Sequence, residues 1–463
     1  MTAPVPINKK KEQKASAPVN LLSGFKDRLP ADVPYWEQII DLIRSLARDY
    51  SFFQIETPVI EDARLFSILN ENDGSDGDTL ITFPLGDGPA VALRPENTLP
   101  LARAYREHGF ASLPQPVKIF TLGPQFRAER PGAGRLRQFT QFGLEVFGDA
   151  SPIVDAQIIA AVHFFFQDLG LDVRLHLNSI GHPACRAQYE KLLADFYRTR
   201  RSVLCDDCKQ KLAKNPMRLL VCQVPECQEV AQEAPQIIDH LCDPDRQHFV
   251  QVLEHLDEVD VSYVLDSRLL RDKPYYNRTV VEFFVTLNDG RTTAIAGGGR
   301  FDDLVTAIGG EPTPAFGVAA GVERIILAMK EQGIQPPASP APDVFLAQIG
   351  DDARKKSLRL FLDLRHDGIK VAESLSKEGI KAQLETATRV RARFALILGQ
   401  KEIMDGTILL RDMENGMQEV VDVQKIIPEV KKRLQSARVN GSSRPSQPPV
   451  IPASPTVTRP NEP

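Results

Sequence analysis

The chain contains 463 residues, of which 42% are hydrophobic and 25% charged, and its formal net charge at pH 7 is −5. This length exceeds one ordinary domain and predicts two or three, and the composition is typical of a soluble globular protein. No run of about 18 apolar residues exists, so we expect no transmembrane helix and no membrane association. The negative total does not exclude nucleic-acid binding, which needs only a local basic surface.

Both ends of the chain and one internal segment are predicted to lack regular structure. Residues 1–20 carry three consecutive lysines with no apolar stretch after them, which also argues against a secretory signal peptide. Residues 436–463 are rich in Pro and Ser, a composition that buries too little apolar surface to fold. The proline-rich segment 335–342 predicts a stiff linker between a large domain, residues 21–334, and a compact one, residues 343–435.

The large domain opens with an amphipathic helix over residues 32–50, because Trp36, Ile39, Ile43 and Leu46 recur at helical spacing. A strand over residues 52–56 is predicted to follow. Further along, residues 119–130 and 137–147 predict two strands around the loop 131–134. Since alternate residues of a strand share a face, polar side chains gather on one side of each strand. These side chains are Arg127, Glu129, Gln141 and Glu145. Central strands normally carry apolar side chains, so a ligand-binding platform is the alternative to a solvated sheet face.

All six cysteines lie between Cys185 and Cys242, which argues against a chain-wide disulfide framework and favours an insert, about residues 185–257, in a cytoplasmic protein. Four of them form two close pairs: Cys205, Cys208, Cys222 and Cys227. Such pairs can bind zinc tetrahedrally, and ordinary thiols are the alternative. The sequence leaves this choice open, and we assign no metal ligand from it.

The compact domain alternates between strands and helices. The predicted elements are a strand at 344–347, a helix at 355–364, a strand at 392–398, a hairpin of 407–411 with 420–423, and a closing helix. This pattern indicates an α/β module of normal size for a small domain.

Several polar and glycine-rich segments follow one another along the chain. They are GFKDRLP at 24–30, LRPENT at 93–98, GPQFRAERPGAGRLRQFTQFGLEVFG at 123–148, RDKPYYNRTVVE at 271–282, AGGGRFD at 296–302 and GVAAGVER at 317–324. In order and spacing they are similar to the three motifs of class II aminoacyl-tRNA synthetases and to signatures of the histidyl enzymes. From about Leu21 to Leu434, the chain therefore resembles a bacterial-type histidyl-tRNA synthetase.

The resemblance implies an α+β class II catalytic domain, with a mainly antiparallel sheet flanked by helices and a small inserted domain. A C-terminal α/β anticodon-binding domain would follow. The implied activity is a histidine–tRNA ligase, which activates L-histidine with ATP to histidyl-adenylate, releases pyrophosphate and transfers histidine to the 3′ end of tRNA(His). ATP, Mg²⁺ and tRNA(His) are the implied cofactors and partners, and a homodimer is implied because motif 1 lies at the subunit interface in this class. The insert would contact the acceptor arm of the tRNA.

The resemblance also implies roles for single residues. Arg127, Arg271 and Arg324 would be catalytic, because a guanidinium stays charged and binds phosphate oxygens in a planar fork. The predicted histidine-binding residues are Glu96, Asn97, Thr98, Arg127, Gln141, Glu145, Arg271, Tyr275 and Tyr276. The predicted ATP-binding residues are Arg127, Glu129, Arg135 and Arg324. For Arg135, contact with the acceptor end of the tRNA is the alternative.

The sequence departs from the family pattern at two places. Asp272, Lys273 and Pro274 replace the usual residues after Arg271, so the loop that carries this arginine could have a different conformation. Phe301 replaces a tyrosine and loses a hydroxyl that could have touched the substrate. Because of these changes, a non-catalytic relative remains an alternative, namely the histidine-sensing regulatory subunit of ATP phosphoribosyltransferase. Other class II synthetases, for threonine, proline or glycine, are a third and less favoured hypothesis.

Overall fold

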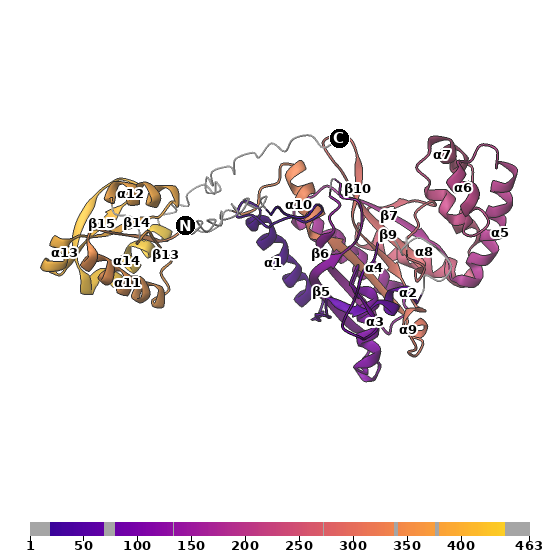
Figure 1. The fold of residues 1–463 in the computed structure, drawn as a ribbon, viewed down its shortest axis with the longest axis horizontal. Coiled ribbons are helices and arrows are strands. Elements are labelled where there is room, and N and C mark those ends of the chain that lie inside the picture. The colour runs from indigo at the N-terminus through magenta and orange to yellow at the C-terminus, as the bar shows by residue number, and fades with distance from the viewer. Residues whose placement is uncertain are drawn as a thin grey trace, which may run out of the picture. The chain divides into compact units, whose positions relative to one another are not determined.

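The computed structural model describes residues 19–68, 79–132, 134–271, 273–337, 341–375 and 379–439 (Figure 1). Contacts divide the chain into two compact units, with a break between Gln335 and Pro336. Most of the predicted irregular segments 1–20 and 436–463 lie outside the described residues, as do Ala338, Ser339 and Pro340 of the linker. The last helix runs to Val439, three residues past the approximate start at Ser436 that the sequence indicates for the C-terminal irregular segment.

The first unit is built on an eight-stranded sheet with the order β1-β5-β6-β11-β10-β9-β7-β8. The strands are β1 (Phe53–Gln54), β5 (Val117–Phe126), β6 (Gln138–Phe147), β7 (Arg174–Ser179), β8 (Val264–Leu265), β9 (Asn277–Thr286), β10 (Thr292–Arg300) and β11 (Ala315–Gly321). The two outermost pairings, β1 with β5 and β7 with β8, are parallel, and the others are antiparallel. The predicted mainly antiparallel sheet is therefore confirmed.

Helices flank this sheet. They include α1 (Val33–Asp49), α3 (Thr98–Glu107), α4 (Pro152–Asp168), α9 (Leu304–Ala307) and α10 (Val322–Glu331). The predicted helix at 32–50 is confirmed by α1. The side chains of α4 are apolar on most of its circumference, and Ile158, Ile159 and Phe165 are fully buried. A helix that is hydrophobic all round belongs in the interior, and α4 accordingly packs between β11 and helix α8 (Asp243–Glu258).

A small three-stranded sheet, ordered β2-β4-β3, precedes the N-terminus of α3 in the chain. Its strands are β2 (Ile60–Asp62), β3 (Ile81–Pro84) and β4 (Ala90–Leu93), and the short helix α2 (Ala63–Ser67) follows β2. Arg94, directly after β4, is almost fully buried. Its guanidinium donates to the carbonyl oxygens of Thr57 and Pro124 at 2.5 and 3.0 Å. This arginine therefore joins the chain after β1 to strand β5 of the large sheet.

Two strands of the large sheet are shorter than their sequence pattern predicts. Strand β5 stops at Phe126, so the expectation that Arg127 and Glu129 share a face of this strand is wrong. The backbone N–H of Arg127 still donates to the carbonyl of Arg137, at 2.9 Å, but the next N–H, of Ala128, donates to Thr79 at 2.8 Å. After Arg127 the backbone therefore stops pairing with β6 and runs beside the residues that precede β3. The predicted strand at 52–56 is likewise reduced to the two residues of β1.

A helical insertion follows β7 and ends before β8. It contains α5 (Pro183–Thr199), α6 (Asp206–Lys211), the 3-10 turn η2 (Pro216–Val221), α7 (Pro225–Gln232), the 3-10 turn η3 (Ile237–His240) and α8. Helices α5, α6 and α7 form a lobe at one end of the unit (Figure 1). Tyr189, Tyr197 and Leu219 of the insertion are buried in the same hydrophobic core as Tyr275 and Tyr276, which directly precede β9. The lobe is therefore packed against the part of the unit that holds the cleft described below.

The second unit is an α/β module with the sheet order β13-β12-β14-β15-β16. Its elements are β12 (Val344–Gln348), α11 (Asp351–His366), β13 (Val371–Glu373), α12 (Ile380–Arg389), β14 (Phe394–Leu398), α13 (Gln400–Asp405), β15 (Thr407–Asp412), β16 (Gln418–Asp422), η4 (Val423–Lys425) and α14 (Ile426–Val439). Alternation along β12 explains its two cores, since Val344 and Leu346 pack with α11 and α14, and Phe345 and Ala347 with α12. In the described part of both units, no helix is long and apolar enough to cross a bilayer.

Candidate active site

Two adjoining cavities, of about 370 and 570 Å³, form one cleft over the large sheet. The residues that line both cavities are Arg127, Glu129, Gln141, Arg271, Gly297 and Ala319. They come from β6, β10, β11 and the loops that follow β5 and precede β9. The cleft is therefore built over central, antiparallel strands, whose backbones are held on both sides by neighbouring strands.

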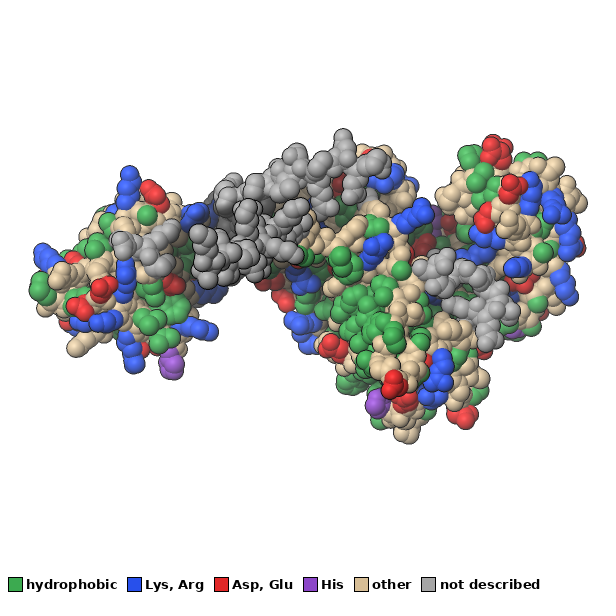
Figure 2. Space-filling model, viewed as in Figure 1, with side chains coloured by type: hydrophobic (Ala, Val, Ile, Leu, Met, Phe, Trp, Pro, Cys, Tyr) green, Lys and Arg blue, Asp and Glu red, His purple; other side chains and the backbone are tan. Residues whose placement is uncertain are grey.

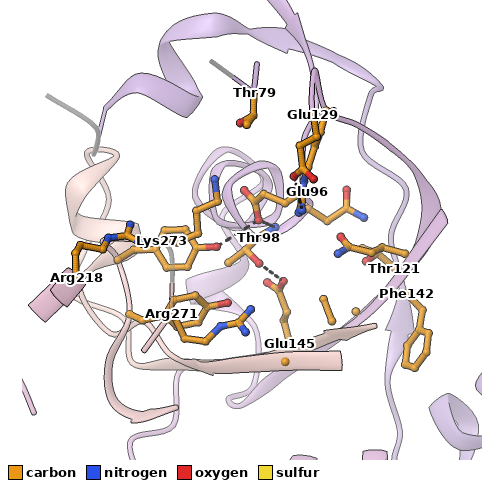
Figure 3. Close-up of a pocket in the computed structure, with 18 residues that line it drawn as sticks. Thr79, Glu96, Thr98, Thr121, Glu129, Phe142, Glu145, Arg218, Arg271 and Lys273 are labelled. Atoms are coloured by element: carbon orange, nitrogen blue, oxygen red, sulfur yellow. Dashed lines mark hydrogen bonds and ion pairs between the residues drawn. The ribbon is translucent and has the colours of Figure 1, made fainter. Parts of the chain in front are cut away.

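The smaller cavity is polar, and the side chains that line it point toward one another from several elements (Figure 3). It collects all of the predicted histidine-binding residues, which are Glu96, Asn97, Thr98, Arg127, Gln141, Glu145, Arg271, Tyr275 and Tyr276. Three of these open helix α3, two lie on β6, and the others come from the loops after β5 and before β9. Segments up to about 180 residues apart in the chain thus meet at this cavity.

Hydrogen bonds fix the acidic side of the smaller cavity. The Glu96 carboxylate accepts from the backbone N–H groups of Thr98 and Leu99, at 2.7 and 3.1 Å, and so satisfies donors that the first turn of α3 leaves unpaired. The Thr98 hydroxyl donates to Oε1 of Glu145 at 2.7 Å. The Tyr275 hydroxyl lies 3.5 Å from Oε2 of Glu96. The orientations of Glu96 and Glu145 are therefore set before any ligand arrives.

Glu145 is the group whose acidity is most altered in this cavity. Its side chain is buried, and burial raises the pKa of its carboxyl to about 8, against the opposing effect of the Thr98 hydrogen bond. Its second oxygen, Oε2, is buried without a hydrogen-bond partner within the described residues. A buried polar atom without a partner costs free energy, so this oxygen indicates a site for a ligand that carries a polar hydrogen or a lone pair.

Tyr275 and Tyr276 form part of the wall of the smaller cavity, and the Phe301 ring packs against both. The Tyr275 and Tyr276 rings lie 4.7 Å apart, and the Phe301 ring packs edge-on against them at 6.0 and 6.4 Å. Phe301 is 1% exposed and lines neither cavity. The expectation that a hydroxyl lost at this position had touched the substrate is therefore not supported by the geometry, because the ring belongs to the core.

The larger cavity is bordered by cations. It contains all four predicted ATP-binding residues, Arg127, Glu129, Arg135 and Arg324. Arg324 is held by the carbonyl oxygens of Gly134 and Ala294, at 3.1 and 2.8 Å. Burial, and then the positive charge of Arg127, lowers the pKa of Arg324. Because like charges are held together here, a polyanion is the ligand that would relieve their repulsion.

Arg271 lies at the junction of the two cavities. Its guanidinium forms an ion pair with Glu282 of β9 and lies 5.5 Å from the centre of the Tyr276 ring. A Cβ on Gly297 of β10 would stand 2.5 Å from an Nη atom of Arg271, so a larger residue there would displace the guanidinium from this position. Lys273 lines the smaller cavity, whereas Asp272 lies outside the described residues. The changed loop sequence therefore still brings Arg271 to the cleft.

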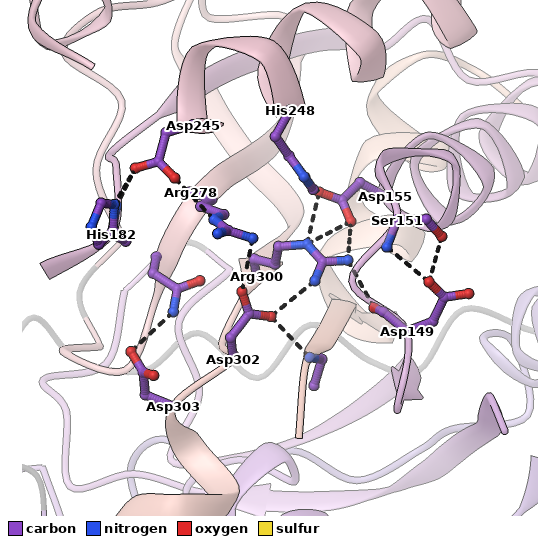
Figure 4. Close-up of polar contacts among 12 residues, drawn as sticks. Asp149, Ser151, Asp155, His182, Asp245, His248, Arg278, Arg300, Asp302 and Asp303 are labelled. Carbon is purple, nitrogen blue, oxygen red and sulfur yellow. Dashed lines mark hydrogen bonds and ion pairs between the residues drawn. The ribbon is translucent and has the colours of Figure 1, made fainter. Parts of the chain in front are cut away.

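The arginine of the AGGGRFD segment does not reach the cleft. Arg300 is fully buried and forms ion pairs with Asp155 and Asp302, at 2.8 and 2.9 Å (Figure 4). Asp155 also contacts Nε2 of His248 at 2.9 Å, which connects α4, α8 and the end of β10. Arg300 is therefore part of a buried charge network that holds the scaffold together beneath the site.

Several lining residues were not identified from the sequence. They are Thr79, Thr121, Arg218, Lys273, Glu282 and Glu323. Lys273 and Glu282 lie in the RDKPYYNRTVVE segment together with Arg271, so this shared segment could have identified them as lining residues. Arg218 comes from η2 in the insertion, and nothing in its local sequence indicates that it faces the cleft.

Residues 24–325 match the histidyl-tRNA synthetase family, and residues 343–433 match an anticodon-binding domain. The chain belongs to the histidyl-tRNA synthetase family. It is 42% identical to the histidine–tRNA ligase of Dehalococcoides mccartyi strain 195 over 89% of this chain and 99% of that protein. It is 40% identical to the ligase of Pelotomaculum thermopropionicum over 89% of this chain and 97% of that protein. Apo S. aureus histidyl-tRNA synthetase has a similar structure, with a TM-score of 0.75 and 30% identity, over 89% of this chain and all of that one.

Family membership also bears on the expected architecture. The predicted class II catalytic domain and the C-terminal anticodon-binding domain are both confirmed by these matches. The anticodon-binding match weighs against the regulatory alternative, since we expect that relative to lack this domain. The exact domain boundaries that the sequence indicates remain predictions.

Proposed function

We propose that the two cavities hold the two small substrates of a histidine–tRNA ligase, with histidine in the smaller and ATP in the larger. The ligase activity itself, with its use of ATP, follows from membership of the family and from the curated relatives. The observation that supports the assignment of substrates is that Arg127 and Arg271 line both cavities. The atoms that react in amino-acid activation would meet at this junction.

The chemistry requires cations at that junction. A carboxylate oxygen of histidine attacks the α-phosphorus of ATP, a new oxygen–phosphorus bond forms, and the bond to the β-phosphate oxygen breaks to release pyrophosphate. Negative charge builds up on the non-bridging oxygens of the α-phosphate, and preorganised donors stabilise it. Arg127 and Arg271 would supply those donors, and Arg324 would bind the γ-phosphate end.

The acidic network of the smaller cavity would recognise the two polar ends of histidine. Glu96, Thr98 and Gln141 would hold the amino group and carboxylate, with Asn97 and Tyr275 completing the wall. Glu145 and Tyr276 would hydrogen-bond the imidazole. A site built to bond a polar side chain rejects analogues that lack it, because its own buried groups would stay unpaired.

Magnesium would accompany ATP. Carboxylates of Glu129 and Glu282 lie on the wall of the larger cavity, and oxygen ligands of this kind, together with phosphate oxygens, suit Mg²⁺. The ion would neutralise charge on the outer phosphates. Glu282 is already paired with Arg271, so this carboxylate would also orient the arginine.

We also propose that the chain acts on tRNA(His) in the cytoplasm, and that it does so as a homodimer. Strand β1 is an edge of the large sheet, and its Phe53 side chain is 73% exposed. Hydrophobic side chains gather on the face over β5 and α3 (Figure 2). An exposed apolar edge strand favours pairing with another chain, and motif 1, which includes this strand, forms the subunit interface in class II synthetases. Sedimentation of the wild type and of Phe53→Glu tests this proposal.

Histidine-dependent exchange of pyrophosphate into ATP is the direct test of the proposed roles. We expect exchange with histidine and none with threonine or proline. Apart from Arg218, the insertion would act later, at the acceptor end of the tRNA, so changes there should affect tRNA charging more than exchange. Arg135→Ala should lower exchange if Arg135 binds ATP, and charging alone if it contacts the tRNA. An intact protein that binds histidine but supports no exchange would instead favour the regulatory alternative.

A further inference from the structure

Four cysteines of the insertion lie close together in space, although they come from three different helical segments. Cys205 precedes α6 and Cys208 lies in its first turn, while Cys222 follows η2 and Cys227 lies in the first turn of α7. All four sulfur atoms lie within 4.8 Å of one another. We call these four residues the four-cysteine cluster.

The spacing of the sulfur atoms fits a metal and not a disulfide. The Sγ atoms of Cys205 and Cys222 are 3.9 Å apart, whereas a disulfide requires about 2.05 Å. Four thiolates around a tetrahedral zinc ion, each about 2.3 Å from it, lie about 3.8 Å from one another. The C-x₂-C and C-x₄-C spacings are also within the range of structural zinc sites.

Backbone donors around the cluster are placed as they are around thiolate ligands. The N–H of Cys205 points to Sγ of Cys227 at 3.2 Å, and the N–H of Cys208 points to Sγ of Cys205 at 3.4 Å. Such hydrogen bonds orient a ligand and stabilise its negative charge. Cys208 and Cys227 are 1% exposed, while Cys205 and Cys222 are partly exposed. The cluster is thus shielded on one side and open to an entering ion on the other.

A second group in the insertion has metal-ligating residue types but is already satisfied without an ion. It consists of His182, Cys185, Cys242 and Asp245, whose ligating atoms also lie within 4.8 Å of one another. The Asp245 carboxylate accepts from the backbone N–H of His182 at 2.8 Å, contacts its Nδ1 at 2.6 Å and accepts from Arg278 at 3.0 Å. The arginine already balances the carboxylate charge, so this group serves as an internal control.

We propose that the four-cysteine cluster binds one zinc ion, which staples the insertion. Binding exchanges four S–H bonds for four Zn–S bonds and releases the protons to solvent, with no change of oxidation state. The ion would close the segment between Cys208 and Cys222, which contains η2 with its buried Met217, Leu219 and Leu220. A small unit with this much irregular backbone gains stability from a metal staple.

The staple has a consequence for the cleft, and this part of the proposal rests on the proposed function. Arg218, in the middle of η2, lines the smaller cavity, where it lies near Lys273 (Figure 3). Its neighbours Met217 and Leu219 are buried, so the position of the arginine depends on how the turn is held. Zinc would therefore act as a positioning element for a cationic residue of the substrate site.

Metal content of the full-length purified protein tests the proposal. We expect about one zinc per chain by mass spectrometry in the wild type and in Cys242→Ser, and at least a roughly tenfold lower content in Cys208→Ser. Cobalt added to metal-free wild-type protein should give the intense visible absorption of a tetrahedral thiolate site, which needs no variant to fold. A wild type without zinc and without that spectrum would overturn the proposal, as would zinc lost from Cys242→Ser but kept in Cys208→Ser.

Arg218→Ala separates the metal site from the cleft. This variant should keep its zinc and raise the KM for histidine or ATP. Zinc content is measured without any turnover, so a protein that holds zinc but lacks histidine-dependent exchange would refute the proposed function and leave the metal site standing. Unchanged KM values in Arg218→Ala would overturn the positioning role.

Discussion

Replacing Glu145 by Gln tests whether this carboxyl recognises imidazole. Gln keeps an oxygen for the Thr98 hydroxyl, which is 2.7 Å from Oε1, and puts an amide in place of the unpartnered Oε2. The change removes the charge and the exchangeable acidic proton and nearly preserves the volume. A hydrogen bond to a charged group contributes about 1.5–3 kcal/mol, so we expect the KM for histidine to rise about 10- to 150-fold. The KM for ATP should change little.

The pH dependence gives the test a sharper form. In the empty cavity the pKa of Glu145 is about 8, because of burial, while the imidazole of free histidine loses its proton at about pH 6.5. The carboxyl and imidazole need one shared proton. Below the imidazole pKa both the carboxyl and the imidazole are protonated, so the pair has one proton too many. Above the pKa of Glu145 both have lost the proton, so the pair has one too few. The wild-type kcat/KM for histidine should therefore be bell-shaped, and Gln, which has no such proton to lose, should lack the alkaline limb near pH 8.

Folding stability provides an independent readout with a defined sign. Burial raises the pKa of Glu145 above its ordinary value of 4.5, so the folded state holds its proton more tightly than the unfolded state. The folded state therefore loses stability as the pH rises from about 4.5 and the loss is complete above about 8. Glu145→Gln should lack this loss. Glu190→Gln is the control, because burial also raises the pKa of Glu190, a glutamate that is less buried than Glu145 and lines neither cavity.

The outcome that would refute this reasoning is specific. If Glu145→Gln kept a wild-type KM for histidine and an unchanged alkaline limb, the unpaired oxygen would have no part in binding imidazole. An equal defect in Glu190→Gln would show that loss of any buried carboxyl disturbs the enzyme, and would remove the argument for a local contact.

Three further changes test other parts of the site. Arg271→Ala should lower the rate of pyrophosphate exchange by about 10²- to 10³-fold, with Arg271→Lys recovering only part because it lacks the planar fork; full exchange in the alanine variant would contradict its role. Arg300→Met should destabilise the first unit by about 3–5 kcal/mol, seen as a lower melting temperature, because Asp155 keeps a buried charge without its partner; an unchanged melting temperature would argue against the buried network. Gly317→Ala would put a Cβ 2.7 Å from Cγ of Glu145, so the KM for histidine should rise about 10- to 100-fold while the KM for ATP stays within the range of the wild type.

Much of the architecture follows from local patterns. The helical spacing of Ile39, Ile43 and Leu46 predicts α1 within one residue at each end. Apolar segments predict β12, β14, β15 and β16 of the second unit but not β13, and the predicted hairpin forms between β15 and β16. Such elements can be predicted from short stretches of sequence, because the spacing of their apolar residues shows which face is buried.

Other features depend on contacts that local patterns do not contain. Strand β5 ends at Phe126, and two residues later the backbone N–H of Ala128 donates to the carbonyl of Thr79, about 50 residues earlier in the chain. Arg300 and Phe301 lie in a segment that resembles a substrate-binding signature, yet both are buried beneath the site. A sequence motif indicates that residues matter together, but not which of them faces the ligand.

By itself, the sequence determined the family, several of the helices and strands, and the set of polar residues available for chemistry, because motifs and periodicity are local properties. Only the tertiary structure decided which of those residues meet. It set Arg127 and Arg271 at a common junction, left Oε2 of Glu145 unpaired, brought Arg218 from the insertion to the cleft and gathered four sulfur atoms around one point. The physical reason is that burial and side-chain convergence depend on packing between segments distant in the chain, and no local spacing encodes those distances.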